Sequence, residues 1–297
     1  MGVKLCRCSD NMISIIIPSY NRCTVIPRAL DSIQRQNYLE WECIVVDDGS
    51  TDDTENVVAE YVKQDSRYRY LKNTRKKGAQ GARNTGIIEA KGDWVVLFDS
   101  DNKMHHDFLG KVVEAINREN IDVCSTWSYV IDENTEERIG EFKWSGYGEV
   151  HNNLLAGKSY FDNSSTIIRR QLLVDIGLLD EDCPAFQEWD THIRLSNIGR
   201  YYTIQEYLID YYTGSKDSIS ASKTKDIKGY LFILQKYKKE WIKTSRMSFI
   251  KYCTILRMKM DIGGADNSYE ISYRQLLPFH YRLVVYVMSY LYKLKNH

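Results

Sequence analysis

Short apolar runs that alternate with helix-patterned segments fill the first hundred residues of this chain. Two of the runs, 12–19 and 94–98, are rich in Ile, Val or aromatic residues, and each is typical of a buried β-strand. Shorter runs at 42–46 and 68–71 have the same character, and segments with apolar residues at helical spacing separate the runs. Strands that alternate with helices predict a largely parallel sheet covered by helices on both faces.

The composition is that of a globular protein, with 43% hydrophobic and 27% charged residues in a chain of 297. The formal net charge is zero, so we expect no nucleic-acid partner. Seven cysteines without the spacing of a disulfide framework predict reduced thiols, and Cys6 and Cys8 lack a second pair to complete a zinc site. Residues 1–12 contain no signal-peptide pattern and no segment predicts a spanning helix, so we expect a cytoplasmic protein.

Positive charge is concentrated near the C-terminus, where residues 223–259 hold eleven Lys or Arg against two acids. We predict a flexible tail at 1–11, an α/β domain at 12–220 and a tyrosine-rich helical extension at 221–297. Three interpretations of the extension stay open: packing against the α/β domain, self-association as a homo-oligomer, and peripheral contact with the inner face of a membrane. The tyrosines favour packing or self-association over membrane contact.

Polar side chains follow the ends of the predicted strands, in the strings PSYN (18–21), DDGS (47–50), ARN (82–84) and DSD (99–101). Parallel strands bring their C-terminal ends to one edge of a sheet, where ligands bind. The carboxylates of Asp99 and Asp101 are hard oxygen ligands that suit a divalent cation carrying phosphate groups. Asp and Asn also favour ordinary turns, so a structural explanation stays open.

Taken together, the strings SIIIPSYNR, VVDDGSTDDT, GARNTGI and FDSDN resemble glycosyltransferase family 2, the inverting nucleotide-sugar transferases of GT-A fold. The resemblance covers about residues 12–212. It implies a Rossmann-like, mixed and mostly parallel sheet flanked by helices. Within the domain at 12–220 it implies a nucleotide-binding half at 12–102 and an acceptor-side half at 103–220.

The resemblance also assigns residues to a nucleotide-sugar site. Pro18, Tyr20 and Asn21 would line the nucleoside pocket, with Tyr20 stacked on the base. Asp48 would accept a hydrogen bond from the base, and Arg83 would offer a planar donor fork to phosphate or base. A strand-ending turn, a helix cap and a surface salt bridge are the structural alternatives for these positions.

For the metal, the resemblance points to Asp101 as the ligand of Mn²⁺ or Mg²⁺. Asp99 is the second candidate ligand, and Asp99 and Ser100 would otherwise lie against the ribose. The cation would bridge the two phosphates of the donor and neutralise the charge that develops as the nucleoside diphosphate leaves.

A candidate catalytic base follows the family's acceptor-side segment, which the string at 163–181 resembles. The family usually has Glu-Asp, an aromatic residue and Asp, whereas this chain has Gln187, Glu188, Trp189 and Asp190. Glu188 takes the place of the catalytic Asp, and Asp190 is the second choice. Trp189 is a candidate wall of the sugar site, with a core position as the alternative; the two acids also suit the first turn of a helix.

The resemblance therefore implies an inverting transferase that moves a hexose or N-acetylhexosamine from a UDP-sugar to a hydroxyl of a glycan, lipid-linked or protein-linked acceptor. A non-catalytic protein that binds nucleotide-sugars or glycans on a transferase scaffold is the alternative. A nucleotidyltransferase would carry a Gly-rich loop with Lys or Arg after the first strand, and residues 18–22 are not such a loop.

Overall fold

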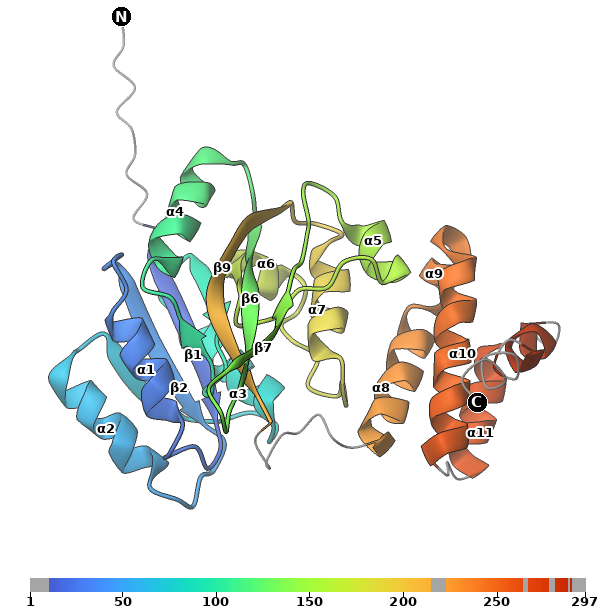
Figure 1. Cartoon of the computed structure of the whole chain (residues 1–297), viewed down its shortest axis with the longest axis horizontal. Helices are drawn as coiled ribbons and strands as arrows, with labels where there is room; N and C mark the ends of the chain where they lie inside the picture. Colours follow the sequence, from blue (N-terminus) through green and yellow to red (C-terminus); the bar gives the residue numbers. More distant parts are fainter. Residues whose placement is uncertain (1–10, 215–222, 264–266, 278–280, 288, 290–297) are drawn as a thin grey trace, which may run out of the picture. The chain divides into compact units, whose positions relative to one another are not determined.

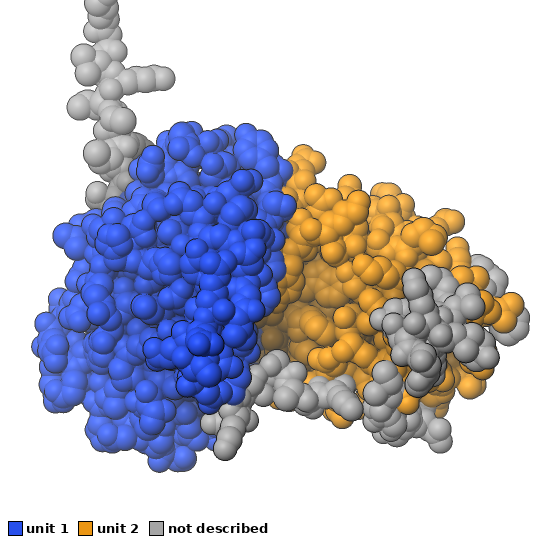
Figure 2. All heavy atoms as spheres, in the orientation of Figure 1, with its two compact units in different colours: residues 1–148, 161–179, 198–214 blue, residues 149–160, 180–197, 215–297 orange. Residues whose placement is uncertain are grey.

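The structure is a computed structural model that describes residues 11–214, 223–263, 267–277, 281–287 and 289 (Figure 1). The chain divides into two compact units, which we call the sheet unit and the helical unit (Figure 2). The sheet unit comprises residues 1–148, 161–179 and 198–214, and the helical unit comprises residues 149–160, 180–197 and 215–297.

A nine-stranded mixed sheet forms the sheet unit, in the order β3-β2-β1-β4-β8-β6-β9-β5, with β7 paired to β6. Its strands are β1 (Ile13–Ser19), β2 (Trp41–Asp47), β3 (Tyr68–Lys72), β4 (Trp94–Leu97), β5 (Lys103–Met104), β6 (Val123–Asp132), β7 (Arg138–Phe142), β8 (Thr166–Arg169) and β9 (Tyr201–Thr213). Its helices are α1 (Ile26–Gln34), α2 (Thr54–Gln64), α3 (Ala79–Glu89), α4 (Phe108–Arg118) and α6 (Arg170–Asp175).

Strand β1 lies at the centre of the parallel part of the sheet. It pairs in parallel with β2 on one side and β4 on the other, and β2 pairs in parallel with β3. Strand β8 then runs antiparallel to both β4 and β6. The predicted fold class, a mixed sheet flanked by helices with further helices at the C-terminus, is confirmed.

The β-branched residues of β1 are buried on both faces of the sheet, as the apolar run predicts. Ile13, Ile15 and Ile17 belong to one core cluster with residues of α1, α2 and α4. The opposite face carries α3, which lies so close that a Cβ added at Gly86 would be 2.3 Å from Cγ2 of Ile16. Only glycine permits this approach, which holds the helix that carries Arg83 against the central strand.

Two strands of the second half have no counterpart in the sequence prediction. Strand β9 pairs in parallel with β6 over most of its length, and the two-residue strand β5 pairs with the same β9. The register of β6 and β9 shifts near Trp127, so the alternation of exposed and buried residues is interrupted. From the sequence, the segments 122–131 and 138–143 predict the two strands of a hairpin around 132–134, and residues 166–168 predict a short strand. The pairing of β6 with β7 and the strand β8 confirm these predictions.

The described part of the helical unit contains the helices α5 (His151–Ala156), α7 (Gln187–Leu195), α8 (Lys223–Lys236), α9 (Lys238–Thr244), α10 (Arg246–Gly263) and α11 (Asn267–Leu276). A further helical segment covers residues 281–287. Tyr237, Tyr252 and Tyr273 are at most 8% exposed, so these tyrosines pack inside the unit. Cys43, Cys124, Cys183 and Cys253 are buried free thiols, whereas Cys6 and Cys8 lie outside the described residues. No helix within the described ranges has the length and apolar character required to span a bilayer.

The helical unit takes in two segments that the sequence places inside the α/β domain, 149–160 and 180–197. The boundary predicted near 220 adjoins residues 215–222, which lie outside the described residues, as do residues 1–10 of the predicted tail. The candidate nucleotide and metal residues therefore belong to the sheet unit, and the candidate base belongs to the helical unit.

Candidate active site

The DDGS string forms the turn after β2, and its two aspartates have different contacts. The Asp47 carboxylate accepts hydrogen bonds from the backbone N–H groups of Gly49 (3.1 Å) and Ser50 (3.0 Å), as in an Asx turn. Asp48 accepts bonds from the N–H of Gly78 (2.8 Å) and from Nδ2 of Asn73 (2.7 Å). Asp48 thus joins the end of β2 to the start of α3, and its carboxylate keeps lone pairs for a ligand.

The PSYN string forms the turn after β1 and lies against the turn after β2. Asn21 adopts the left-handed conformation, with φ of 53°. Its backbone N–H donates to Oγ of Ser50 (2.9 Å), and its Oδ1 accepts from the N–H of Thr51 (2.8 Å). Tyr20 is 47% exposed, with Nζ of Lys77 4.9 Å from its ring centre. An exposed aromatic ring beside a cation at a strand end suits a stacked base and a phosphate.

Arg83 and Asp99 form an ion pair at the end of β4. The Arg83 guanidinium is 2.6 Å from Oδ1 of Asp99 and 2.8 Å from Oε1 of Gln80, and its side chain is 6% exposed. Oγ of Ser164 accepts from the Asp99 backbone N–H (3.1 Å) and from Nδ2 of Asn102 (2.8 Å). The structure therefore brings together two of the residues assigned by resemblance, and it adds Ser164 and Asn102 as their supports.

The carboxyl group of Asp101, in the DSD string, ionises less readily than that of an ordinary aspartate. Burial, together with the negative charge of Asp99, raises its pKa to about 6, and Arg22 opposes this shift. A divalent cation would relieve the cost of the ionised form, and the carboxylate oxygens of Asp99 and Asp101 are hard donors of the type that Mn²⁺ and Mg²⁺ bind. Among the described residues no three His, Cys, Asp or Glu side chains form a metal-binding group. A cation here would thus require further oxygen ligands from a phosphate or water.

Arg28 of α1 fixes the backbone at this position and was not found from the sequence. Its Nε and Nη2 donate to the carbonyl oxygen of Asp101 (3.0 and 2.5 Å), and Nη1 donates to Oε1 of Glu133 (3.1 Å). The guanidinium carbon lies 3.6 Å from the ring centre of Tyr212. The sequence feature that could have pointed to Arg28 is its position among the apolar residues of the predicted helix.

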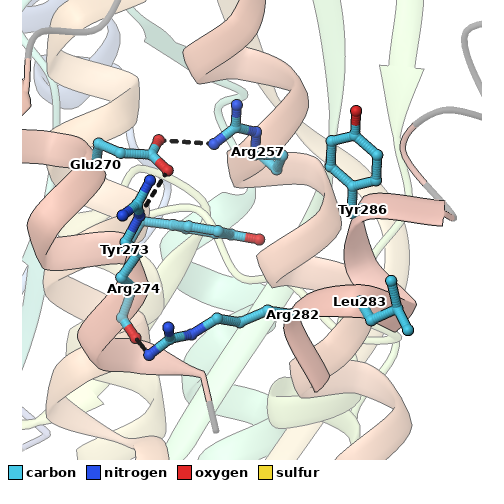
Figure 3. A pocket seen from close by; sticks show the side chains of 7 residues that line it. All are labelled: Arg257, Glu270, Tyr273, Arg274, Arg282, Leu283 and Tyr286. Carbon is cyan, nitrogen blue, oxygen red and sulfur yellow. Dashed lines mark hydrogen bonds and ion pairs between the residues drawn. The ribbon is translucent and has the colours of Figure 1, made fainter. Parts of the chain in front are cut away.

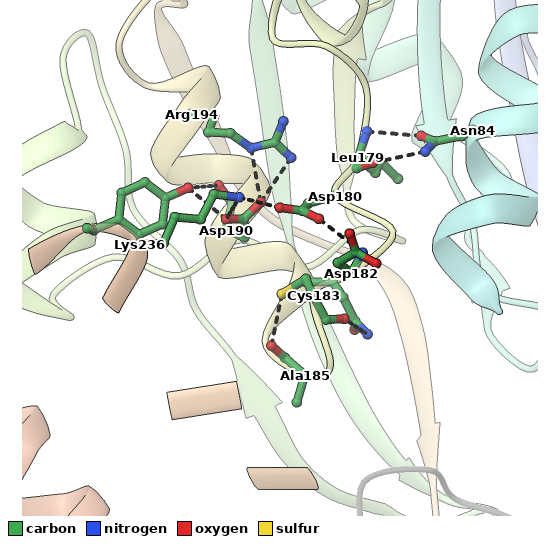
Figure 4. A network of polar contacts seen from close by, with 11 residues as sticks. Asn84, Leu179, Asp180, Asp182, Cys183, Ala185, Asp190, Arg194 and Lys236 are labelled. Atoms are coloured by element: carbon green, nitrogen blue, oxygen red, sulfur yellow. Dashed lines mark hydrogen bonds and ion pairs between the residues drawn. The ribbon is translucent and has the colours of Figure 1, made fainter. Parts of the chain in front are cut away.

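In the helical unit, Asp190 is the centre of a buried charge network (Figure 4). Its carboxylate is 1% exposed and accepts from Nε of Arg194 (3.0 Å), Nζ of Lys236 (2.7 Å) and the hydroxyl of Tyr237 (2.7 Å). Lys236 also pairs with Asp180 (2.6 Å). Two cations and a hydroxyl occupy both oxygens of Asp190, which favours a role in joining α7 to α8 and α9.

Glu188 and Trp189 lie in the first turn of α7, which begins after Phe186 in a left-handed conformation, with φ of 61°. Trp189 is 8% exposed, donates from Nε1 to the carbonyl of Leu154 (3.0 Å) and lies 4.8 Å from the ring of Tyr252. These contacts favour the core alternative for Trp189. Glu188 is half-buried, and the next residue in the sequence, Trp189, is buried.

Comparisons with known proteins identify the family of this chain. A family model described as "Glycosyl transferase family 2" matches residues 14–177, more than half of the chain. The chain belongs to this family. The match begins in β1 and ends just after α6, so it includes every nucleotide-site and metal-site candidate, whereas Glu188, Trp189 and Asp190 lie beyond it.

Curated relatives carry the same family character. The amylovoran biosynthesis glycosyltransferase AmsB of Erwinia amylovora is 30% identical over 85% of this chain and 86% of the relative. The UDP-Glc:alpha-D-GlcNAc-diphosphoundecaprenol beta-1,3-glucosyltransferase WfgD of Escherichia coli is 32% identical over 57% of this chain and 58% of the relative. Across the first three relatives, the matched part spans 34%, 58% and 41% of their own lengths.

Solved structures share the fold. S. aureus TarS 1–349 in complex with UDP-GlcNAc aligns with a TM-score of 0.61 and 17% identity, covering 84% of this chain and 81% of that one. The mannosyltransferase PcManGT from Pyrobaculum calidifontis, in complex with GDP-Man and Mn²⁺, aligns with a TM-score of 0.56 and 18% identity over 94% and 84% of the two chains. At these identities the likeness establishes the GT-A fold alone.

The raised pKa of Asp101 predicts that this residue destabilises the fold at neutral pH. Its folded-state pKa of about 6 exceeds the ordinary value of 3.8, so stability falls as the pH rises from about 4 to about 6 and stays reduced above that. Replacing Asp101 by Asn should raise the free energy of unfolding at pH 7.5, by at most about 3 kcal/mol because solvent access lowers the effect, and by almost nothing at pH 4. Urea unfolding with EDTA present measures both.

Asp52 provides a control of opposite sign. Although desolvation raises the pKa of Asp52, hydrogen bonds from Thr54 and Cys23 hold it at about 2. Asp52→Asn should therefore lower stability at pH 7.5. An Asp101→Asn variant that is less stable than the wild type at pH 7.5 would contradict the claim that ionised Asp101 destabilises the fold.

The Asp190 network predicts a large structural effect. Asp190→Asn leaves two cations without their buried partner and should lower the free energy of unfolding by about 3 kcal/mol or more. The matched change Asp180→Asn, at a carboxylate whose side chain is 26% exposed, should cost less than about 1 kcal/mol. Equal stability of the two variants in urea unfolding would argue against the anchoring role.

Proposed function

We propose that this chain is an inverting glycosyltransferase that moves a hexose or N-acetylhexosamine from a UDP-sugar to a hydroxyl group of a glycan, a lipid-linked acceptor or a protein-linked acceptor. The observation that carries the proposal is the gathering of the PSYN turn, the DDGS turn, Arg83 and the DSD string at the C-terminal ends of the parallel strands. Asp101 lies at this edge of the sheet, and its raised pKa means that its ionised form would be stabilised by a cation. Such a site suits a metal-bound diphosphate.

The donor is proposed as a UDP-sugar on two kinds of support. The name of the relative WfgD specifies UDP-Glc, and TarS was solved with UDP-GlcNAc. Tyr20 would stack on the base, with Pro18 and Asn21 shaping its pocket, and Asp48 would accept a hydrogen bond from it. PcManGT was solved with GDP-Man, so a guanine nucleotide is the competing donor in a screen.

We propose Mn²⁺ or Mg²⁺ as the cofactor, held by Asp101 with Asp99 as the second ligand. PcManGT was solved with Mn²⁺, which supports a divalent ion in this fold. When bound, the ion would neutralise negative charge on the departing nucleoside diphosphate. The chain's own contribution is positional: Arg28 holds the carbonyl of Asp101, and Arg83 balances the charge of Asp99.

Glu188 is the proposed catalytic base. Its carboxylate would take the proton of the acceptor hydroxyl while that oxygen attacks the anomeric carbon and the nucleoside diphosphate leaves from the opposite face, which inverts the configuration. The contacts of Asp190 with two cations and a tyrosine leave Glu188 as the better candidate of the two. Glu is one methylene longer than the family's usual Asp, so its carboxylate can reach farther from the helix.

The acceptor is proposed as a growing surface polysaccharide or lipid-linked glycan. The names of AmsB and WfgD refer to amylovoran biosynthesis and to a diphosphoundecaprenol-linked acceptor. A protein-linked acceptor has no comparable support among these relatives. The departure from the family pattern at Gln187 and Glu188 keeps the non-catalytic binding protein as the second candidate function.

Turnover of UDP-sugars with Mn²⁺ separates the two functions. We expect UDP release from one donor in the presence of acceptor, and we expect Glu188→Gln to reduce kcat at least about 100-fold with donor binding unchanged, because a positioned base contributes 10²- to 10⁴-fold. The control Glu149→Gln, an exposed carboxylate in the same unit, should keep wild-type kcat. Equal turnover of Glu188→Gln and wild type would reject Glu188, and donor binding without turnover on any acceptor would favour the binding protein.

A further inference from the structure

A pocket of about 320 Å³ lies among α10, α11 and the helical segment 281–287, far along the chain from the candidate site (Figure 3). It is lined by three arginines, two tyrosines, one carboxylate and one leucine: Arg257, Arg274, Arg282, Tyr273, Tyr286, Glu270 and Leu283. We call it the arginine pocket. Every residue in it belongs to the helical unit.

The helical segment 281–287 exposes most of its apolar side chains. Leu283 is 68% exposed, Val284 44%, Tyr286 63% and Val287 45%, whereas Val285 is only 1% exposed and anchors the segment. Four large apolar residues within five positions form a continuous exposed patch. Such a patch on a protein marks an interaction surface.

Three arginines and two carboxylates lie beside this patch, so the local charge is net positive. Arg257 pairs with Asp261 (2.9 Å) and Glu270 (2.6 Å), and Arg274 also uses Glu270 (3.2 Å). Arg282 donates instead to the backbone carbonyls of Leu277 (3.0 Å) and Arg274 (2.5 Å). Within the part of the chain that the structure describes, no carboxylate pairs with Arg282, so its charge is not neutralised.

We infer that the segment 281–287 and the arginine pocket form a docking surface for an anionic phospholipid bilayer. The side chains of Leu283, Val284, Tyr286 and Val287 would enter the interface between headgroups and acyl chains, and Arg282 and Arg274 would meet the headgroup phosphates. An apolar strip with basic residues at its edge has the chemistry of an interfacial helix.

Charge favours a bilayer over a second copy of this chain as the occupant. Residues 223–259 add eleven Lys or Arg against two acids, so the helical unit as a whole attracts an anionic surface. A symmetric dimer through this patch would place Arg282 of one copy near the same cationic pocket of the other, which like-charge repulsion opposes. Tyr237, Tyr252 and Tyr273 are buried inside the unit, so they are not available for a dimer interface.

Co-sedimentation of the full chain with vesicles tests this inference. The vesicles contain either phosphatidylcholine alone or phosphatidylcholine with phosphatidylglycerol. The buffer contains EDTA, with no added metal ion or sugar donor. We expect binding to the anionic vesicles only. Leu283→Ser combined with Tyr286→Ser should weaken this binding at least tenfold, and Arg282→Gln should weaken it about fivefold, the contribution of one basic residue at an anionic surface.

Met247→Ser is the matched control, because Met247 is 71% exposed in the same unit and lies outside the patch. It should bind like the wild type, and circular dichroism should show all variants folded. Equal binding of the wild type and the double variant, equal binding to both kinds of vesicle, or a patch-dependent dimer without vesicle binding would each overturn the inference. The assay uses neither donor nor acceptor, so a negative result would leave the proposed glycosyl transfer intact. Likewise, a failure to detect glycosyl transfer would leave the inferred bilayer contact intact.

Discussion

Parallel pairing of β1 with β2 and with β4 is the constraint on which the candidate site depends. The pairing places Ser19 opposite Asp47 and Ile16 opposite Leu97, so the turns after all three strands emerge at the same edge of the sheet. Burial of Ile13, Ile15, Ile16 and Ile17 on both faces fixes that register. Arg28, which lies 73 positions before Asp101 in the sequence, then donates hydrogen bonds to the carbonyl oxygen of Asp101.

The first half of the fold was predictable because each element carries its own local signal. The runs at 12–19, 42–46, 68–71 and 94–98 became β1 to β4, with helices between them. Strand β9 was missed because its tyrosines and its polar residues at 205–206 do not alternate regularly, and because it pairs with β6 across a register shift. The grouping of 149–160 and 180–197 with the C-terminal helices depends on distant contacts, such as that of Trp241 Nε1 with the carbonyl of Leu155 (2.7 Å).

The candidate site shows the same division between local and distant information. The aspartates, Tyr20 and Arg83 were found from their position after predicted strands, with roles supplied by family resemblance. Arg28 and Ser164 act through hydrogen bonds to backbone atoms of the DSD string, which no local pattern encodes. Asp190 and Trp189 resemble site residues in sequence, yet both are held in the core of the helical unit. Three donors contact the Asp190 carboxylate. Trp189 donates to a backbone carbonyl and packs against the rings of Trp241 and Tyr252. Burial distinguishes these anchors from Glu188.

Calorimetric titration of UDP into the wild type and Asp101→Ala, each with Mn²⁺ or with EDTA, tests the central claim most directly. If Asp101 holds a cation that carries the diphosphate, Mn²⁺ should strengthen UDP binding to the wild type at least about tenfold and leave binding to Asp101→Ala unchanged. The affinities of the two proteins in EDTA should be similar. An equal Mn²⁺ effect in both proteins, or no Mn²⁺ effect on the wild type, would contradict the account.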